Sequence, residues 1–421
     1  MAQISVIHTT VSSAVAGTAT SFAEVVESDA LVSGKTYYIV CHGITKGNNS
    51  NQVFQWRLVD RTNSDAVLSN STLIREATQN NVTQAYYFVG RITAGGDGGG
   101  IAFEQKSPHT DYTVTTEYLS LMIFDISSMD PGDFFFANDT TATEHDTTLT
   151  TRATVTNPDP RTGDEYIVWA WASTGTDSVV INSEMKLVST EVSHASQHVL
   201  ASYEGEDLTE QLGYMVAQHY SYGGVNKDIT WEVQTRDDGA GDSNEYLEST
   251  IFGLRLNAFE NFFGDYTSTE TTNTSANTFA ELDTASFTPD ASGDVIVTAC
   301  AIFSGDATVQ KSTARVQVDG STSPNTVPDS KRSANTNDGT DDLPLSYITK
   351  YSATGGTAAT IDLDVDKSTA NDIGWKQYTL AGFTVKLADG DPTHKNNISM
   401  FRRARIGALS RGRLRNKRFR R

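Results

Sequence analysis

Apolar and polar residues alternate along short stretches of the chain, and polar turns separate these stretches. Residues 101–107 (IAFEQKS) and 361–368 (IDLDVDKS) alternate as a strand with one face in water does. Residues 37–43 (YYIVCHG) carry apolar residues on both alternating faces, as a central strand of a sandwich does. The turns, such as GGDGGG (95–100) and ATGGTA (353–358), are rich in residues that tolerate turn conformations. This pattern predicts an all-β protein.

One series of five landmarks occurs three times at intervals of 128–132 residues. The landmarks are a glycine before an apolar strand, a basic residue within a strand, a double glycine after a tyrosine strand, the centre of an alternating strand, and a phenylalanine in a closing strand. In that order they are Gly34, Gly163 and Gly293; Arg57, Lys186 and Arg315; Gly95, Gly223 and Gly355; Phe103, Trp231 and Leu363; Phe124, Phe252 and Phe383.

The repetition predicts three tandem antiparallel β-sandwich units of the jelly-roll or immunoglobulin-like kind, followed by a basic C-terminal arm. We place unit 1 at residues 1–128, unit 2 at 129–259, unit 3 at 260–390 and the arm at 391–421. The joints between units are short, which favours fixed orientations in a rod or a compact stack.

Charge is divided unevenly along the chain. Eleven of the 32 basic residues and none of the 52 acidic residues lie in 395–421, so the preceding 394 residues carry 21 basic against 52 acidic residues. An acidic body of this kind repels nucleic acid and anionic lipid, whereas the tail is attracted to both.

Several classes of protein are excluded or disfavoured by composition. Two cysteines cannot form a disulfide-stapled scaffold or a four-cysteine zinc site, and no apolar run approaches the roughly 20 residues that span a bilayer. The start MAQISVIHTT lacks the features of a conventional secretory signal. Cys41 and Cys300 lie at apolar positions of related strands, so we predict buried free thiols. We expect no enzymatic activity, no cofactor and no membrane partner.

Two groups of residues are candidate binding sites. Aspartates in two glycine-rich loops offer hard oxygen ligands for calcium, although neither loop fits a twelve-residue calcium motif; these are Asp237, Asp238, Asp242, Asp338, Asp341 and Asp342. Trp56, Trp231 and Trp375 are candidates for stacking on sugars, and core packing is the alternative for each.

The arm carries the main functional expectation. Its cations are interleaved with a few apolar residues, a combination suited to a segment that orders on an acidic partner. We expect it to dock on an acidic protein surface, with nucleic-acid binding and a free tail as alternatives. The basic residues of the predicted site are Arg402, Arg403, Arg405, Arg411, Arg413, Arg415, Lys417, Arg418, Arg420 and Arg421.

The tandem sandwich units, the texture rich in Ser, Thr, Asn and Gly, the leaderless start and the basic arm together resemble a virion structural protein of a tailed bacteriophage. The resemblance implies a capsid decoration, head fibre, knob or tail-associated protein, often trimeric, that is made in the host cytoplasm and ends in the virion. Its partners would be other virion proteins, such as the capsid or neighbouring copies. A carbohydrate-binding module for host recognition is the first alternative, and a polysaccharide depolymerase is the second.

Overall fold

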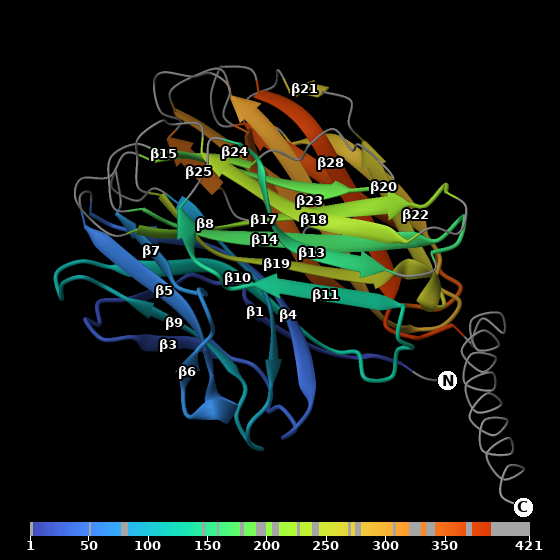
Figure 1. Ribbon diagram of the computed structural model, residues 1–421, viewed down its shortest axis with the longest axis horizontal. Helices are drawn as coiled ribbons and strands as arrows, with labels where there is room; N and C mark the ends of the chain where they lie inside the picture. Colours follow the sequence, from blue (N-terminus) through green and yellow to red (C-terminus); the bar gives the residue numbers. More distant parts are fainter. Residues whose placement is uncertain are drawn as a thin grey trace, which may run out of the picture.

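The structure is a computed structural model of the chain (Figure 1). It describes residues 3–388 except 50–51, 77–82, 145–147, 158–159, 177–180, 191–198, 204–209, 225–227, 238–243, 268–270, 274–278, 306–308, 320–329, 334–341 and 368–372. The described part contains 28 strands in five sheets, in which every pairing is antiparallel, and two 3-10 helices of three residues each. The prediction of an all-β fold is confirmed.

The strands of unit 1 are β1 Ser5–Val11, β2 Val15–Gly17, β3 Ala23–Glu27, β4 Thr36–Gly47, β5 Val53–Asp60, β6 Ala66–Val67, β7 Leu73–Glu76, β8 Thr83–Thr93, β9 Ile101–Lys106 and β10 Val114–Asp125, with the helix η1 at Arg61–Asn63. The strands of unit 2 are β11 Phe134–Asp139, β12 Thr143–Glu144, β13 Thr150–Asn157, β14 Glu165–Thr176, β15 Ile181–Ser189, β16 Val199–Tyr203, β17 Glu210–Ser221, β18 Ile229–Asp237 and β19 Asn244–Arg255, with the helix η2 at Leu256–Ala258. The strands of unit 3 are β20 Phe262–Thr267, β21 Thr271–Asn273, β22 Ala280–Phe287, β23 Gly293–Gly305, β24 Val309–Val318, β25 Ser330–Ser333, β26 Asp342–Ala353, β27 Ala359–Lys367 and β28 Ile373–Thr384.

Each unit repeats one strand order. Leaving aside the short strands β2, β6, β12 and β21, every unit has eight strands, and the first, eighth, third and sixth form one sheet: β1-β10-β4-β8, β11-β19-β14-β17 and β20-β28-β23-β26. The second, seventh, fourth and fifth form the other: β3-β9-β5-β7, β13-β18-β15-β16 and β22-β27-β24-β25. This is the order of a jelly roll, so the structure decides between the two sandwich types that the sequence left open.

Two isolated bridges, Gln3 with Lys386 and Phe259 with Leu387, cross the predicted unit ranges. Pairings between the strands of the described part stay within these ranges, with one exception. Gln211 of β17 pairs with Ile74 of β7, and this contact joins four main strands of unit 2 and four of unit 1 into a single ten-stranded sheet. The unit boundaries themselves remain a prediction.

Glycines among the landmarks make turns that other residues would strain. Gly34, Gly163 and Gly356 have φ angles of 76°, 90° and 71°, which glycine adopts without penalty from a Cβ atom.

The pairing register shows that one landmark belongs to a different residue of unit 2. Phe124 lies opposite Tyr38 in unit 1. Ile167 follows Tyr38 at the same interval that separates Arg57 from Lys186, so it is the unit 2 equivalent of Tyr38, and it lies opposite Leu254. Leu254 therefore replaces Phe252 as the unit 2 equivalent of Phe124.

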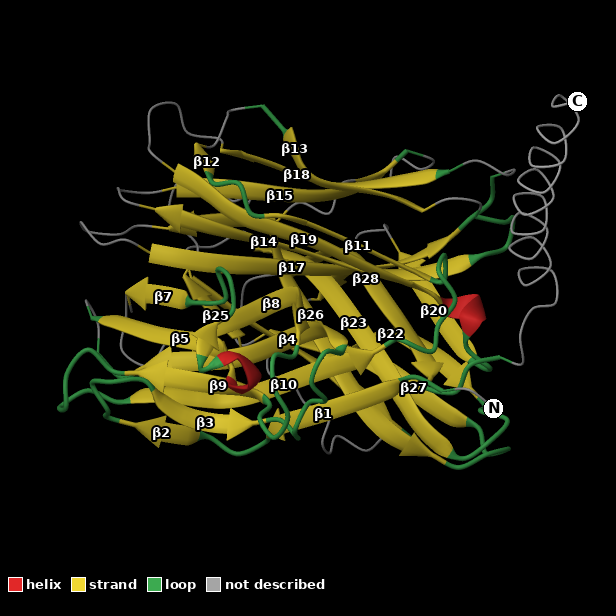
Figure 2. Ribbon diagram, turned by 60° about the horizontal axis from the view of Figure 1, so that its bottom comes forward, coloured by secondary structure: helices red, strands yellow, loops and turns green. Residues whose placement is uncertain are grey.

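The three units form a closed ring in which the sixth strand of each unit packs on the third and eighth strands of another. β8 of unit 1 lies on β14 and β19 of unit 2, β17 of unit 2 on β23 and β28 of unit 3, and β26 of unit 3 on β4 and β10 of unit 1. The fifth strands follow the same cyclic rule, with β7 against β17, β16 against β26 and β25 against β8. A rod is therefore wrong, and these cyclic contacts make the described part a compact ring with threefold pseudosymmetry. The strands of the three units are packed closely together in Figures 1 and 2.

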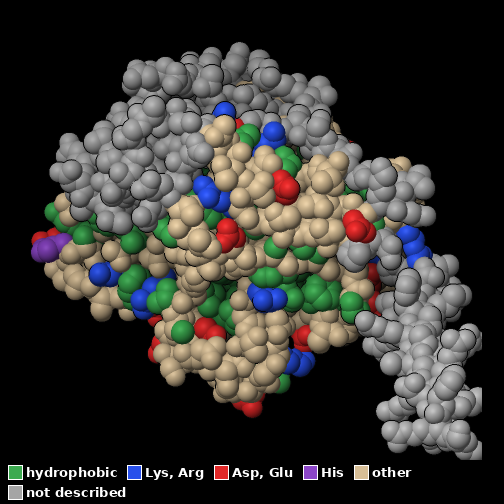
Figure 3. Space-filling view, viewed as in Figure 1, with side chains coloured by type: hydrophobic (Ala, Val, Ile, Leu, Met, Phe, Trp, Pro, Cys, Tyr) green, Lys and Arg blue, Asp and Glu red, His purple; other side chains and the backbone are tan. Residues whose placement is uncertain are grey.

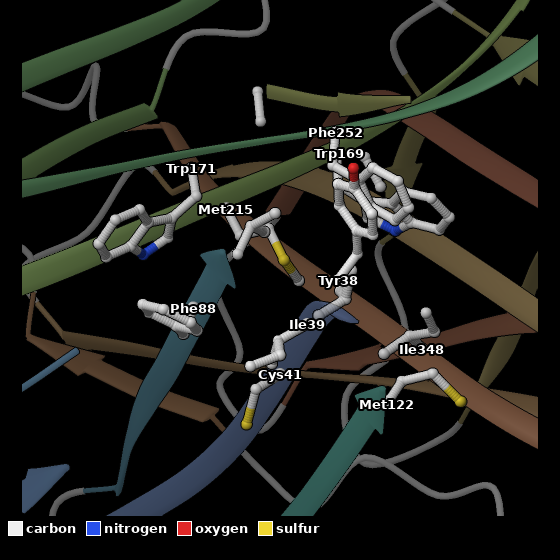
Figure 4. Close-up of a cluster of buried hydrophobic side chains, with 14 of the residues drawn as sticks. Tyr38, Ile39, Cys41, Phe88, Met122, Trp169, Trp171, Met215, Phe252 and Ile348 are labelled. Carbon is white, nitrogen blue, oxygen red and sulfur yellow. The ribbon is translucent and has the colours of Figure 1, made fainter. Parts of the chain in front are cut away.

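The axis of the ring is a buried, mainly apolar cluster to which all three units contribute (Figure 4). Tyr38 stacks on Phe252 with ring centroids 4.9 Å apart, and Phe88 meets Trp171 edge to face at 5.2 Å. Ile348 of unit 3 belongs to the same cluster. The sheet faces that a lone sandwich would expose to water are thus covered by neighbouring units, which explains why both faces of the third strands are apolar.

Hydrogen bonds between the units fix how the sixth strands meet. The Trp171 indole N–H donates to the Tyr87 carbonyl at 2.9 Å, and the Tyr87 hydroxyl donates to the Pro344 carbonyl at 3.1 Å. The Ser346 hydroxyl donates to the Met215 carbonyl at 2.6 Å. Each pair of units therefore shares at least one buried hydrogen bond besides its apolar contacts, and this defines the register of the ring.

We predict that Trp171→Ala lowers the free energy of unfolding by about 3–5 kcal/mol, because it removes a buried indole from the contact between units 1 and 2. The control Trp171→Phe keeps an aromatic ring near Phe88 but lacks the N–H that donates to Tyr87. Loss of that hydrogen bond accounts for about 1 kcal/mol of the decrease in its free energy of unfolding. Urea denaturation, monitored by tryptophan fluorescence, measures the free energy of unfolding of both variants. A loss below about 1 kcal/mol for the alanine variant would contradict the packing role.

Candidate partner-binding end of the ring

Both chain ends of the described structure and both joints between units lie together at one end of the ring. This joint end comprises residues 3–4, the first joint 126–133, the second joint 256–261 and residues 385–388. The N-terminus and helix η2, which begins the second joint, lie on the same side of the molecule in Figure 2. The eighth strands bring the chain to this end, because β10 and β19 each finish where a joint begins.

Backbone contacts tie the two chain ends to the joints. The Ile4 N–H donates to the Val385 carbonyl at 3.0 Å, and the Ala388 N–H donates to the Ala258 carbonyl at 3.0 Å. The Ser128 hydroxyl donates to the Gln3 carbonyl at 2.9 Å. The last described residues therefore lie at a fixed place beside both joints, and the predicted arm follows them in the sequence.

Side chains reinforce the second joint where it meets the last strand. Lys386 pairs with Glu260 at 2.7 Å, and the rings of Phe259 and Phe383 stack with centroids 4.3 Å apart. The ion pair is partly exposed and contributes little by itself. The stacked rings bury the apolar side of the joint, so the last described residues before the arm have a firm base.

A buried arginine links the two joints. Arg255, 4% exposed, pairs with Asp133 at 2.6 Å and with Asp164 at 3.4 Å, and its backbone N–H donates to the Asp133 carbonyl. Burial acts to lower the pKa of Arg255, but the two carboxylates outweigh it and raise that pKa. The role of Arg255 was not predicted from the sequence. A lone arginine directly after the apolar run Ile251–Leu254 is the signal that could have revealed it.

A second, more exposed ion pair lies in unit 1 at the same end. Lys35 contacts Asp125 at 2.6 Å, and the hydrogen bond to that carboxylate raises the pKa of Lys35. On the face shown in Figure 3, acidic and basic side chains are interspersed among neutral ones. The charges named at the joint end are thus paired with one another.

The predicted binding arm falls outside the described residues. This applies to Arg402, Arg403, Arg405, Arg411, Arg413, Arg415, Lys417, Arg418, Arg420 and Arg421. Its role therefore stays a prediction, and the structure describes only residues up to Ala388, which lie at the joint end.

The predicted sugar-stacking role of three tryptophans is wrong. Trp56 is 1% exposed, and Trp231 and Trp375 are 0% exposed. Trp231 stacks on Phe135 with ring centroids 5.9 Å apart inside unit 2. A ring enclosed on all sides by protein cannot meet a sugar at the surface, so core packing, the alternative reading of these residues, holds.

The calcium hypothesis is largely outside the described part of the chain. Asp238, Asp242, Asp338 and Asp341 are not described, whereas Asp237 ends β18 and Asp342 begins β26. Within the described residues no group of three or more His, Cys, Asp or Glu side chains is arranged to hold a metal ion. The hypothesis stays a prediction.

The two cysteines are buried free thiols, as predicted. Burial raises the pKa of both Cys41 and Cys300, which keeps them protonated and poorly nucleophilic. Cys300 belongs to the cluster at the axis, where its Sγ lies 3.2 Å from Ser346 Oγ. Both side chains therefore act as small packing residues.

We predict that Arg255→Met lowers the free energy of unfolding by about 3–5 kcal/mol, because it leaves Asp133 and Asp164 buried without their cation. Lys35→Met is the matched control, since it removes a cation whose side chain is 45% exposed at the same end and should have a much smaller effect. Thermal and urea unfolding compare the two. Equal losses would contradict the role of Arg255 in linking the joints.

No protein-family model and no curated protein matches the chain. None of the helices in the described residues is long and apolar enough to span a membrane. Solved structures with similar regions include one from a study titled as the atomic structure of Sulfolobus turreted icosahedral virus, with 13% identity, 88% of this chain and 83% of that chain covered, and a TM-score of 0.19.

Two further solved structures have the same low level of similarity. A protein described under the triple jelly roll fold and turret assembly of an archaeal virus has 12% identity, 85% of this chain and 82% of that chain covered, and a TM-score of 0.17. Eiger TNF from S. frugiperda has 13% identity over 30% of this chain and 93% of its own, with a TM-score of 0.19. These scores are too low to support an argument, so the jelly-roll assignment rests on the strand order alone.

Proposed function

We propose that this chain is a non-enzymatic structural protein of a bacteriophage particle, which decorates the capsid or forms a fibre or knob. The observation that carries the proposal is a closed ring of jelly rolls whose last described residues, which precede the basic arm in the sequence, lie at one end beside both joints. The ring is a passive body, and the arm is its anchor. The protein would reside in the virion after synthesis in the host cytoplasm.

The distribution of charge supports this division of labour. Residues 1–394 carry 52 acidic against 21 basic residues, so free copies repel one another and stay apart before assembly. Residues 395–421 of the arm, with eleven cations and no acidic residue, overcome that repulsion at an acidic surface on another virion protein. Many copies on one particle would then hold by avidity.

The start of the arm also gives the ring a direction. If the arm anchors the protein, the joint end faces the partner and the opposite end of the ring faces away. In unit 1 that opposite end carries the loop 107–113 before β10, and the twelve residues of β10 separate it from the first joint by roughly 40 Å.

Neutralising the arm tests the anchoring role. A variant with all eleven Lys and Arg residues of 395–421 replaced by Gln should stay folded, because the contacts described above end at Ala388, and should enter particles at least tenfold less. A variant with the same arm composition in scrambled order keeps the charge and is the control. Quantitative mass spectrometry of purified particles gives the copy number.

Normal incorporation of the neutral variant would refute the anchor. If the chain with its natural arm enters only particles that contain nucleic acid, and not empty ones, the partner of the arm is nucleic acid and not an acidic protein.

The direction of the ring predicts which tags are accessible on particles. A peptide tag inserted between His109 and Thr110, where the His109 side chain is 60% exposed, should bind antibody on intact particles. The same tag placed before Gln3 should bind only after particles are disrupted. The reverse pattern would show that the ring is anchored by its other end.

A further inference from the structure

The three contacts between units are not equivalent in their covalent linkage. Units 1 and 2 are joined through residues 126–133, and units 2 and 3 through residues 256–261. Units 1 and 3 are the first and last parts of the described chain, so no peptide joint links them. They meet where β26 packs on β4 and β10, where β25 lies against β8, and at the joint end through the hydrogen bond from Ile4 to Val385. We call this contact the closing seam. It holds by non-covalent contacts alone.

A buried histidine lies in the closing seam with its ring against unit 3. His42 of β4 is 1% exposed, and its ring centroid lies 5.0 Å from that of Tyr347 on β26. The Ile348 N–H of β26 points to His42 Nδ1 at 3.4 Å, so Nδ1 must carry the lone pair. The neutral ring then bears its proton on Nε2, which is buried without a hydrogen-bond partner.

A second histidine is linked to the same residue of unit 3 through Ser120. The Ser120 hydroxyl of β10 donates to the Ile348 carbonyl at 2.7 Å, and Ser120 Oγ lies 2.9 Å from His8 Nε2. Because the hydroxyl proton goes to the carbonyl, His8 Nε2 acts as the donor to Ser120. Both backbone groups of Ile348 are thus bound by a network that ends in two imidazoles of unit 1.

The equivalent positions of the other two contacts have no histidine. Trp171 and Cys300 follow His42 at the intervals that relate the landmarks Arg57, Lys186 and Arg315, so they are its equivalents in units 2 and 3. Both side chains lie in the apolar cluster of the axis.

A histidine does occur elsewhere in the contact between units 2 and 3, but it has a counter-charge. His219 packs against Gly264, and its Nε2 lies 2.7 Å from a carboxylate oxygen of Glu165. His219 therefore has a carboxylate beside its ring.

Among the described residues of the closing seam, no carboxylate compensates a proton on His42 in this way. The titratable groups around its ring are Tyr118 of β10, Tyr347 of β26 and His8 of β1. A proton on Nδ1 would face the Ile348 N–H, so a donor would meet a donor. Burial, with a smaller contribution from His8, lowers the pKa of His42 to about 3.

His8 has charged neighbours of both signs in unit 3. They are Lys350 of β26 and Asp294 of β23, which pair with each other at 2.8 Å. Burial and Lys350 lower the pKa of His8 to about 4, and Asp294 opposes them. Both imidazoles are therefore neutral in the closed ring at pH values at which a free histidine is charged.

We propose that the closing seam is an acid-sensitive contact, in which protonation of His42 and His8 releases unit 3 from unit 1 while the two jointed contacts stay closed. Both histidines have an ordinary pKa near 6.5 once exposed and lower values in the closed ring. The closed form is therefore fully favoured above pH 6.5 and loses stability as pH falls. Its opening constant rises by roughly tenfold per histidine for each pH unit below 6.5, down to about pH 4.

Hydrogen exchange and small-angle X-ray scattering of the full chain between pH 7 and pH 4 test the proposal. With labelling times corrected for pH, residues 36–47 and 342–353 should lose protection at a higher pH than residues 165–176, and the radius of gyration should increase in the same step. This measurement needs no variant. Loss of protection at all three contacts in one step would overturn the proposal.

The double variant His8→Gln and His42→Gln keeps hydrogen-bonding groups but cannot be charged, so its opening midpoint should fall by at least one pH unit. His109→Gln, in an exposed loop, and His219→Gln, at the contact between units 2 and 3, are matched controls that should open as the natural chain does. An unchanged midpoint in the double variant, or an equal shift in either control, would assign the acid response to other groups.

Discussion

The packing of each sixth strand on the next unit's third and eighth strands is the contact on which the rest of the structure depends. It covers a sheet face that each jelly roll would otherwise expose, and it buries aromatic side chains such as Trp169 and Trp171 at the axis. Because the contact is cyclic, it closes after three units and leaves no free copy of that face. The closed ring then brings both joints and the first and last described residues to one end.

Fusion of three units in one chain also allows the three contacts to differ, which identical subunits of a homotrimer could not do. His42, Trp171 and Cys300 are equivalent positions of the three units, yet these side chains are an imidazole, an indole and a thiol. The first contact is the most aromatic, with stacking between Tyr38 and Phe252. The closing contact, which lacks a peptide joint, is the one that contains the buried histidine network. The side chains at the three contacts between units thus differ, although the three units share one strand order.

Periodicity and repetition were enough to predict strands, antiparallel sandwiches and a threefold repeat, because these depend on local alternation and on spacing within one chain. Burial of Cys41 and Cys300 was predicted correctly for the same reason, since both lie within apolar strands. The sugar-stacking role of Trp56, Trp231 and Trp375 failed because alternation shows that a residue has one buried face, but not whether a second sheet covers the other. Arg255 was missed because its partners, Asp133 and Asp164, lie far from it along the chain.

By itself, the amino-acid sequence determined the all-β character, the three copies of one unit and the division into an acidic body and a basic arm. Only the tertiary structure decided the jelly-roll strand order, the closed ring and the meeting of both chain ends with both joints. The physical reason is that strand order and ring closure arise from contacts between residues far apart in the chain, such as His42 with Ile348. Such contacts are selected by shape and burial in three dimensions, which leave no periodic trace along the chain.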